Sequence, residues 1–244
     1  MIQRNGFLGL NSNGVPQYGQ IDNLTFQYTG ANTLYRTSES ANYTKGFLGS
    51  QSTYTYDHGR LTNDSGKNAD VTKYNFLNQP QVIKVAQNMS VKNYWDANGN
   101  LHKQIQYFTG GVEKARYYQD GIEYFTGPND EILIEAIHHG EGRYVYEYDE
   151  NGKFKRNYHE FMISDHLGNV RVRFADLNGD GEINVVDEGP GQEKEVLGSY
   201  HYYPYGMEME GIFHPEDLVD NMYRYNGIEY LGHQGLNVSL ASLS

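Results

Sequence analysis

Short segments in which apolar or aromatic residues alternate with polar ones recur along the chain. Leu24-Thr25-Phe26-Gln27-Tyr28 is an early example. Such alternation places every second side chain on the same face of an extended strand. No long window carries apolar residues at helical spacing without an interrupting Gly or Pro. The pattern therefore predicts an all-β protein.

A loose unit repeats after the first 50 residues: an aromatic pair, an Asp, a turn with Gly and an apolar residue. Copies span 54–62, 94–101 and 146–154, and a degenerate copy spans 117–124. Asp followed by Asn-Gly or His-Gly closes a hairpin and leaves the carboxylate free to bond turn amides. Because a lone hairpin is marginal in water, the copies are expected to join in one antiparallel sheet that buries their aromatic faces. An ordinary β-rich domain that reuses a common turn is the alternative interpretation.

Composition supports strands and turns and excludes several functions. The 244 residues include 23 Tyr and 28 Gly, no Cys, and a formal net charge of −12. Without Cys there is no disulfide framework, thiolate catalysis or Cys-ligated metal. The acid excess argues against binding duplex nucleic acid. No apolar run approaches the roughly 20 residues that span a bilayer, so no membrane span is predicted.

The hairpin units resemble the YD repeats of the RHS/YD-repeat proteins, and three later motifs resemble the RHS repeat-associated core domain. A DHLGNxR motif lies in 164–173, a YxYxPYG motif in 200–207 and a YxYNGxE motif in 223–230, in the family's order and separations. The motif residues are Asp165, His166, Leu167, Gly168, Asn169, Arg171, Tyr202, Tyr203, Pro204, Tyr205, Gly206, Tyr223, Tyr225, Asn226 and Gly227. The resemblance divides the chain into a YD-repeat-like hairpin array, 1–157, and a core segment, 158–244. It is most similar to Bacteroidetes-type members.

This resemblance implies a fold and a function. The fold would be part of an RHS β-shell, in which antiparallel hairpins build a spiralling sheet. The function would be that of a non-enzymatic wall that encapsulates or presents a C-terminal polymorphic toxin. The implied partners are upstream or adjacent RHS shell segments and the toxin cargo, and the implied location is secreted or cell surface. The aspartates of the family's self-cleavage segment are not found before Ser244, so a truncated shell segment is expected and no catalytic residue is assigned.

The segment 176–187 has the ligand spacing of a twelve-residue calcium loop. Oxygen-bearing side chains occupy loop positions 1, 3, 5, 9 and 12, Gly181 allows the sharp turn at position 6, and position 7 offers a backbone carbonyl. The predicted Ca²⁺ ligands are Asp176, Asn178, Asp180, Glu182, Asn184 and Asp187. An acidic Asn/Gly turn between two strands, without a cation, is the alternative.

Two other functions stay open at this stage. Exposed Tyr rows, with Tyr202 and Tyr203 as the residues to test, would bind a cell-surface glycan or a partner protein by ring stacking. A self-cleaving or hydrolytic enzyme is the third hypothesis. The histidines form no compact ligand pattern, and for His166 we expect a packing role rather than acid–base chemistry.

Overall fold

The computed structural model of the chain describes residues 1–30, 32–41, 51–85, 89–111, 113–185, 194–202, 223–225 and 228–229. All regular elements in these ranges are strands. Within them, no helix has the length and apolar character needed to cross a membrane. The predicted all-β class is confirmed.

Sixteen strands form the main sheet. They are β1 (Ile2–Leu10), β2 (Pro16–Thr29), β3 (Thr33–Glu39), β4 (Gln51–Asp57), β5 (Arg60–Asp64), β6 (Ala69–Tyr74), β7 (Pro80–Val85), β8 (Met89–Trp95), β9 (Leu101–Phe108), β10 (Glu113–Gln119), β11 (Ile122–Thr126), β12 (Ile132–His139), β13 (Gly142–Tyr148), β14 (Phe154–Ser164), β15 (Val170–Phe174) and β16 (Val196–Ser199). A separate pair consists of β17 (Tyr223–Tyr225) and β18 (Ile228–Glu229).

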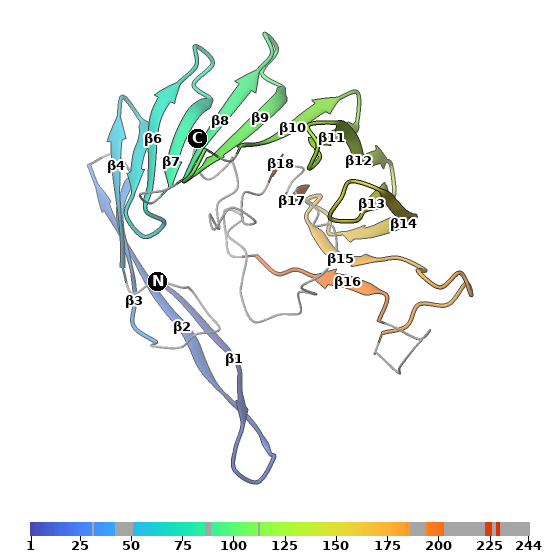
Figure 1. The fold of residues 1–244 in the computed structure, drawn as a ribbon. Helices are drawn as coiled ribbons and strands as arrows, with labels where there is room; N and C mark the ends of the chain where they lie inside the picture. The colour runs from blue at the N-terminus through green and yellow to red at the C-terminus, as the bar shows by residue number, and fades with distance from the viewer. Residues whose placement is uncertain are drawn as a thin grey trace.

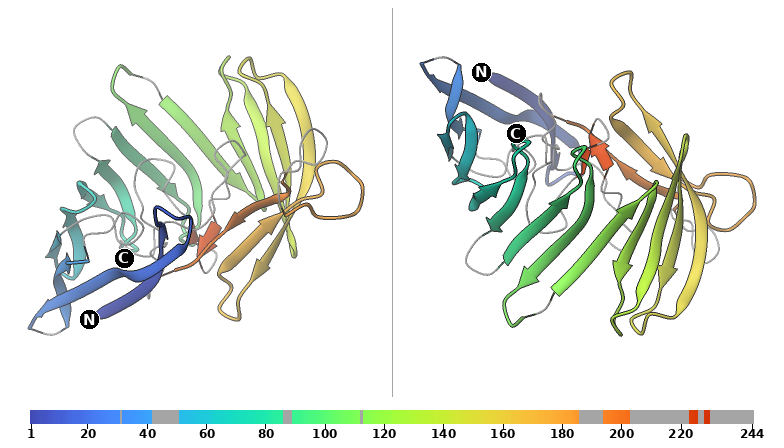
Figure 2. Two further views of the ribbon diagram at one scale, coloured as in Figure 1. Left: turned by 90° about the horizontal axis from the view of Figure 1, so that it is seen from below. Right: turned by 90° about the horizontal axis from the view of Figure 1, so that it is seen from above.

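The order of the strands in the sheet is their order in the chain, and neighbouring strands run antiparallel. Figure 1 shows that this meander bends into an arc, with β17 and β18 inside it and β17 beside β15. The views in Figure 2 show one curved layer of strands. The ends of the sheet, β1 and β16, are not paired with each other among the described residues. β14 runs across residues 157 and 158, so the two predicted parts of the chain share a strand.

Turns of five residues that begin with Asp or Asn connect several of these strands. Asp96 Oδ1 accepts hydrogen bonds from the Asn98 and Asn100 amides, both at 2.8 Å. Asp149 Oδ1 accepts bonds from the Asn151 and Lys153 amides at 3.0 and 2.9 Å. The predicted bonding between the Asp carboxylate and turn amides is confirmed for these two copies. The turn therefore depends on contacts within five residues, which sequence can specify.

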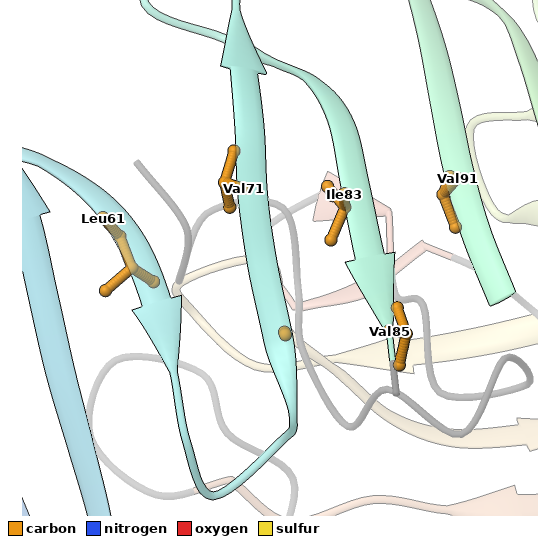
Figure 3. Packing of buried hydrophobic residues seen from close by; sticks show 6 residues of the cluster. Leu61, Val71, Ile83, Val85 and Val91 are labelled. Carbon is orange, nitrogen blue, oxygen red and sulfur yellow. The ribbon is translucent and has the colours of Figure 1, made fainter. Parts of the chain in front are cut away.

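Aliphatic side chains form the core of the first half of the sheet. Leu61, Ala69, Val71, Ile83, Val85 and Val91 are buried together on β5–β8, as Figure 3 shows. Trp95 and Tyr54, from two of the repeat copies, pack against this cluster. The aromatic pairs of these copies therefore contribute in part to the buried face.

The third repeat copy differs from the prediction. In β13 the buried side chains are those of Arg143, Val145 and Glu147, while Tyr146 and Tyr148 lie on the alternate, half-buried face. The expectation that every copy buries its aromatic face is wrong here, because the buried side of these strands is occupied by paired charges. The tyrosines instead contact other rings, as Tyr148 does with Phe154 at 6.2 Å between centroids.

Candidate functional site

The DHLGN motif forms the hairpin turn between β14 and β15. Asp165 Oδ1 accepts hydrogen bonds from the Leu167 and Asn169 amides at 2.9 and 3.0 Å. Asp165 Oδ2 accepts bonds from Asn169 Nδ2 and Arg171 Nε, both at 2.9 Å. The hydrogen bond from the Asn169 side chain is the main reason that the pKa of Asp165 lies well below its usual range, with the Arg171 bond adding to it. Asp165, Asn169 and Arg171 thus act together as a clamp on the turn.

Two further motif residues, His166 and Leu167, lie at the tip of this turn and are exposed to solvent. His166 is exposed, and Leu167 is 60% exposed. The predicted packing role for His166 is wrong, because the turn projects beyond the sheet and leaves its second and third residues uncovered. Gly168 has φ +82, a left-handed conformation that a side chain disfavours. The backbone conformation of the turn therefore explains why a glycine occupies this position of the motif.

The second motif contacts the first. The Arg171 guanidinium lies over the Tyr202 ring, with Cζ 5.4 Å from the centroid, and Tyr202 donates a 2.8 Å hydrogen bond to the Val170 carbonyl oxygen. Tyr202 is half-buried and uses both its ring and its hydroxyl in these contacts, which gives no support to it as a glycan-stacking residue.

The third motif reaches the same strand through β17, which lies beside β15. Its residues Tyr223 and Tyr225 are placed on β17 by their backbone. The remaining predicted motif residues lie outside the described residues: Tyr203, Pro204, Tyr205, Gly206, Asn226 and Gly227. Three segments that are distant in sequence therefore meet around β15.

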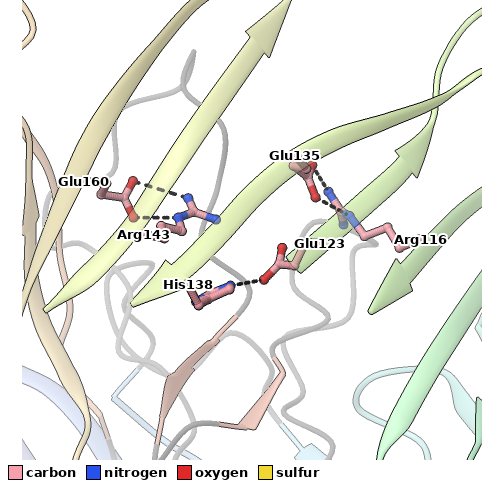
Figure 4. Close-up of polar contacts among 6 residues, drawn as sticks. All are labelled: Arg116, Glu123, Glu135, His138, Arg143 and Glu160. Carbon is pink, nitrogen blue, oxygen red and sulfur yellow. Dashed lines mark hydrogen bonds and ion pairs between the residues drawn. The ribbon is translucent and has the colours of Figure 1, made fainter. Parts of the chain in front are cut away.

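Ion pairs with buried or partly buried side chains cross the sheet between β10 and β15, and Figure 4 shows those on β10 to β14. Arg143 on β13 and Glu160 on β14 are direct cross-strand partners, joined by bonds of 2.9 and 3.3 Å, and both side chains are 0% exposed. Arg173 on β15 extends the network, with Nη1 3.8 Å from Glu160 Oε2. Burial alone would lower the pKa of Arg143, but the charge and hydrogen bonds of Glu160 raise it above its ordinary value.

Further pairs continue this pattern on neighbouring strands. Arg116 on β10 reaches across β11 to Glu135 on β12 with two bonds of 2.9 and 2.7 Å. Arg156 faces Glu147 across the β13–β14 pair with a shortest separation of 2.7 Å. None of these pairs was predicted from the sequence. The sequence did offer a signal. Arg143 and Glu147 are four positions apart, and so are Arg156 and Glu160, a spacing that places both charges on one face of a strand.

Glu123 on β11 and His138 on β12 complete the set. His138 Nε2 and Glu123 Oε1 are hydrogen-bonded. Burial alone would raise the pKa of Glu123, but the hydrogen bond from His138 and the charge of Arg143 lower it. The carboxylate is therefore ionised at neutral pH.

The acidic loop that follows β15 is organised by its own side chains. Asp176 accepts hydrogen bonds from the Gly179 and Gly181 amides at 2.6 and 2.9 Å. Asp180 Oδ1 accepts a bond from the Glu182 amide at 2.8 Å. These contacts give the first half of the predicted ligand segment a compact turn.

Glu195, which was not predicted as a functional residue, closes the loop. Its buried carboxylate accepts bonds from the Leu177 and Asn178 amides at 2.6 and 3.1 Å and from the Asn184 amide at 3.0 Å. The Glu195 amide in turn donates to the Asn184 carbonyl oxygen at 2.8 Å. The two ends of the loop are thereby held together from outside the predicted ligand segment.

The calcium site stays a prediction. Within the described residues, no group of three or more His, Asp or Glu side chains is placed so that it could hold a metal ion. Asp187, the last predicted ligand, lies outside the described residues, so the complete ligand set is not tested.

Among the described residues the architecture is an open, curved, all-antiparallel sheet with a small strand pair inside it, as expected for part of an RHS-type β-shell. It is similar to the crystal structure of TcdB2-TccC3, with a TM-score of 0.56 and 12% sequence identity over 98% of this chain and 14% of that one. It is also similar to the crystal structure of TcdB2-TccC3-TEV, with a TM-score of 0.56 and 13% identity over 93% of this chain and 12% of that one.

A third similar structure is the Tc holotoxin pore of Photorhabdus luminescens, with a TM-score of 0.53 and 13% identity over 93% of this chain and 12% of that one. The chain thus spans about an eighth of the length of the chains that it resembles. No protein-family model matches the sequence, and no curated protein matches it. At this level of identity the likeness concerns the fold.

Proposed function

We propose that the chain is a non-enzymatic wall segment of a secreted or cell-surface shell that encloses or presents a polypeptide toxin. The main support is the continuous sixteen-stranded meander, which bends into an arc and places a strand pair on its inner side. The similar structures are those of a Tc holotoxin pore and of TcdB2-TccC3 complexes. Adjacent shell segments and the toxin are the proposed partners.

The buried ion pairs support a structural role. Arg143, Glu160 and Arg173 use their charged groups to link three consecutive strands. The Asp165 clamp and the Arg171–Tyr202 contact fix the last turns of the sheet to the segment that follows β16. Such contacts hold strands in register. Among the described residues β1 and β16 end the sheet, and further shell strands could add to them there.

The test is protection of a captive polypeptide. The protein would be tagged in its native host, purified without denaturant, and treated with trypsin, with the fragments followed by mass spectrometry. We expect an associated polypeptide that resists trypsin in the native complex and becomes sensitive when Arg143→Ala opens the sheet. Cleavage of that polypeptide at the same rate in the native complex and after denaturation would contradict the proposal.

The enzyme alternative has a separate test. The intact mass of the purified chain would be followed during prolonged incubation at several pH values. We expect a constant mass, and a discrete cut within the chain would contradict the non-enzymatic part of the proposal.

A further inference from the structure

Three lysines gather on one face of the sheet, over β6, β8 and β9. They are Lys73, Lys92 and Lys103, called the lysine face below. Lys92 follows the buried core residue Val91, so its side chain points away from the core. Residues directly opposite each other on neighbouring strands share a face. The cross-strand pairing therefore places Lys73 and Lys103 on the same side as Lys92.

Two tyrosine rings hold two of these ammonium groups in place. Lys92 Nζ lies 4.8 Å from the centroid of the Tyr94 ring. Lys103 Nζ lies 5.8 Å from the same centroid and 4.9 Å from that of Tyr117. Each ring attracts a cation, but the two like charges that share the Tyr94 ring repel each other. An anion that binds beside them would offset this repulsion.

The chain itself does not supply that anion in the part that the structure describes. There, the three lysines form no ion pair. Asp70, an acid on the same face, lies across from Lys84 instead. The direct cross-strand neighbours of the three lysines are apolar or aromatic, namely Val82, Tyr94, Ile105 and Tyr117. The lysine face therefore matches an acidic partner that also offers apolar side chains.

The acidic loop after β15 has these complementary properties. Asp180 and Glu182 are exposed, and neither forms an ion pair with a Lys or Arg of the described residues. Ile183 and Val185, beside them in the chain, are 37% and 64% exposed. The Glu195 carboxylate already holds the loop in shape, so little conformational freedom would be lost when the loop binds a surface.

Within one chain the loop and the lysine face are far apart. β15 lies six strands beyond β9 in the order of the sheet, which is about 29 Å at the usual spacing between strands. Figure 1 shows β8 and β9 in the middle of the arc and the loop after β15 towards its end. A contact between the two surfaces would therefore join two copies of the chain.

We propose that the acidic loop of one copy of this chain docks on the lysine face of a second copy. The loop carboxylates lie against the ammonium groups, and the two exposed aliphatic side chains of the loop lie against the tyrosine rings. The contact is head-to-tail, because each copy contributes a different surface, so it leaves one loop and one lysine face available to further copies. The inference does not depend on the shell function, since it rests on the charge and exposure of these two surfaces.

Sedimentation velocity of the full chain measures the self-association. The buffer contains a chelator, so that no divalent cation competes for the loop carboxylates. We expect the average mass to rise with protein concentration at low salt. In about 0.5 M NaCl the association should weaken at least roughly tenfold, because salt screens the charges that form the contact.

Two neutralised variants locate the surfaces. The face variant carries Lys92→Gln with Lys103→Gln, and the loop variant carries Asp180→Asn with Glu182→Gln. Each should self-associate at least roughly tenfold more weakly than the wild type. An equimolar mixture should form a complex of one face-variant chain and one loop-variant chain with the affinity of the wild type. It should grow no further, because the first keeps only an intact loop and the second only an intact lysine face.

A matched control removes the same charge elsewhere. Lys153 and Lys155 are exposed at the hairpin of β13 and β14, and the double change Lys153→Gln with Lys155→Gln should associate like the wild type. If the face variant fails to fold by circular dichroism, the loop variant decides, since its two substitutions lie outside the strands.

Three results would overturn the proposal. The first is a wild-type chain that stays monomeric up to about 100 μM at low salt. The second is self-association of the loop variant that is as strong as that of the wild type, or a mixture of the two variants that does not associate. The third is binding of polyglutamate to a chain that does not self-associate, which would assign the lysine face to an acidic partner other than a second copy.

Discussion

Arg143 and Glu160 face each other across the β13–β14 pair and form an ion pair, and neither side chain is exposed to solvent. The Arg143 guanidinium uses Nε and Nη2 to bind the two oxygens of Glu160. The pair is one of the charged pairs on β10–β14 that Figure 4 shows, in a half of the sheet that also holds a buried cluster of Val145, Tyr158, Ala175 and Leu197. It is therefore the contact on which we expect the stability of these strands to depend most.

Removing one partner of this pair should destabilise the protein strongly. Arg143→Met leaves the Glu160 carboxylate buried without its main partner, a loss of about 3–5 kcal/mol for breaking a buried pair. Urea unfolding followed by circular dichroism measures the change.

Two further variants calibrate that result. The double change Arg143→Met with Glu160→Leu should recover much of the loss, since a packed apolar pair is often as stable as a buried ion pair. The partly exposed pair of Arg60 and Asp57 provides the control, and Arg60→Met should cost at most about 1 kcal/mol. Equal losses for Arg143→Met and Arg60→Met would show that burial does not govern the effect.

A substitution of Gly142, at the start of β13, tests how closely β13 and β14 approach each other. A Cβ at this position would overlap the Glu160 backbone carbonyl, and that backbone cannot move aside without breaking the β13–β14 register. We expect Gly142→Ala to destabilise the protein by roughly 1–3 kcal/mol or more. A Cβ at Gly140, in the turn before β13, would meet no atom within 4 Å beyond its chain neighbours. Gly140→Ala should change stability by less than about 0.5 kcal/mol, measured in the same unfolding assay.

Because of Asp165, we expect the hairpin of β14 and β15 to weaken in acid. Its pKa is lower in the folded chain than the ordinary value of 3.8, first because of the Asn169 bond. A carboxyl group whose pKa is lowered by folding stabilises the fold above the ordinary value, and the contribution disappears as the pH falls from that value through the folded one. The wild type should therefore have a higher melting temperature than Asp165→Asn at neutral pH. The difference between the two melting temperatures should shrink only below about pH 4. A gap that already closes between pH 7 and pH 5 would contradict this assignment.

Calcium should stabilise the loop after β15 if the ligand prediction is correct. The melting temperature should rise when calcium replaces a chelator, and the loop should become more resistant to proteolysis, because the cation offsets repulsion among the carboxylates. Asp180→Asn should reduce both effects, while Asp130→Asn should leave them intact. An identical melt in calcium and in chelator would count against the site.

The strands and their turns could be predicted from sequence because their causes are local. The turn at 96–100 is made by one carboxylate and two amides within five residues, and the DHLGN turn has the same design. Alternating polar and apolar positions then specify extended strands on both sides. The three motifs that carry the family resemblance could also be read from the sequence, but that those placed in the structure come together around β15 was not predicted.

Which face each strand buries depended on partners far away in the chain. Arg143 is buried because Glu160 lies opposite it, and Arg116 finds Glu135 only by crossing an intervening strand. Glu195 closes the acidic loop from 17 residues beyond Asn178. Alternation along a strand reports that its two faces differ, but cross-strand register decides which charges are paired and can therefore leave solvent.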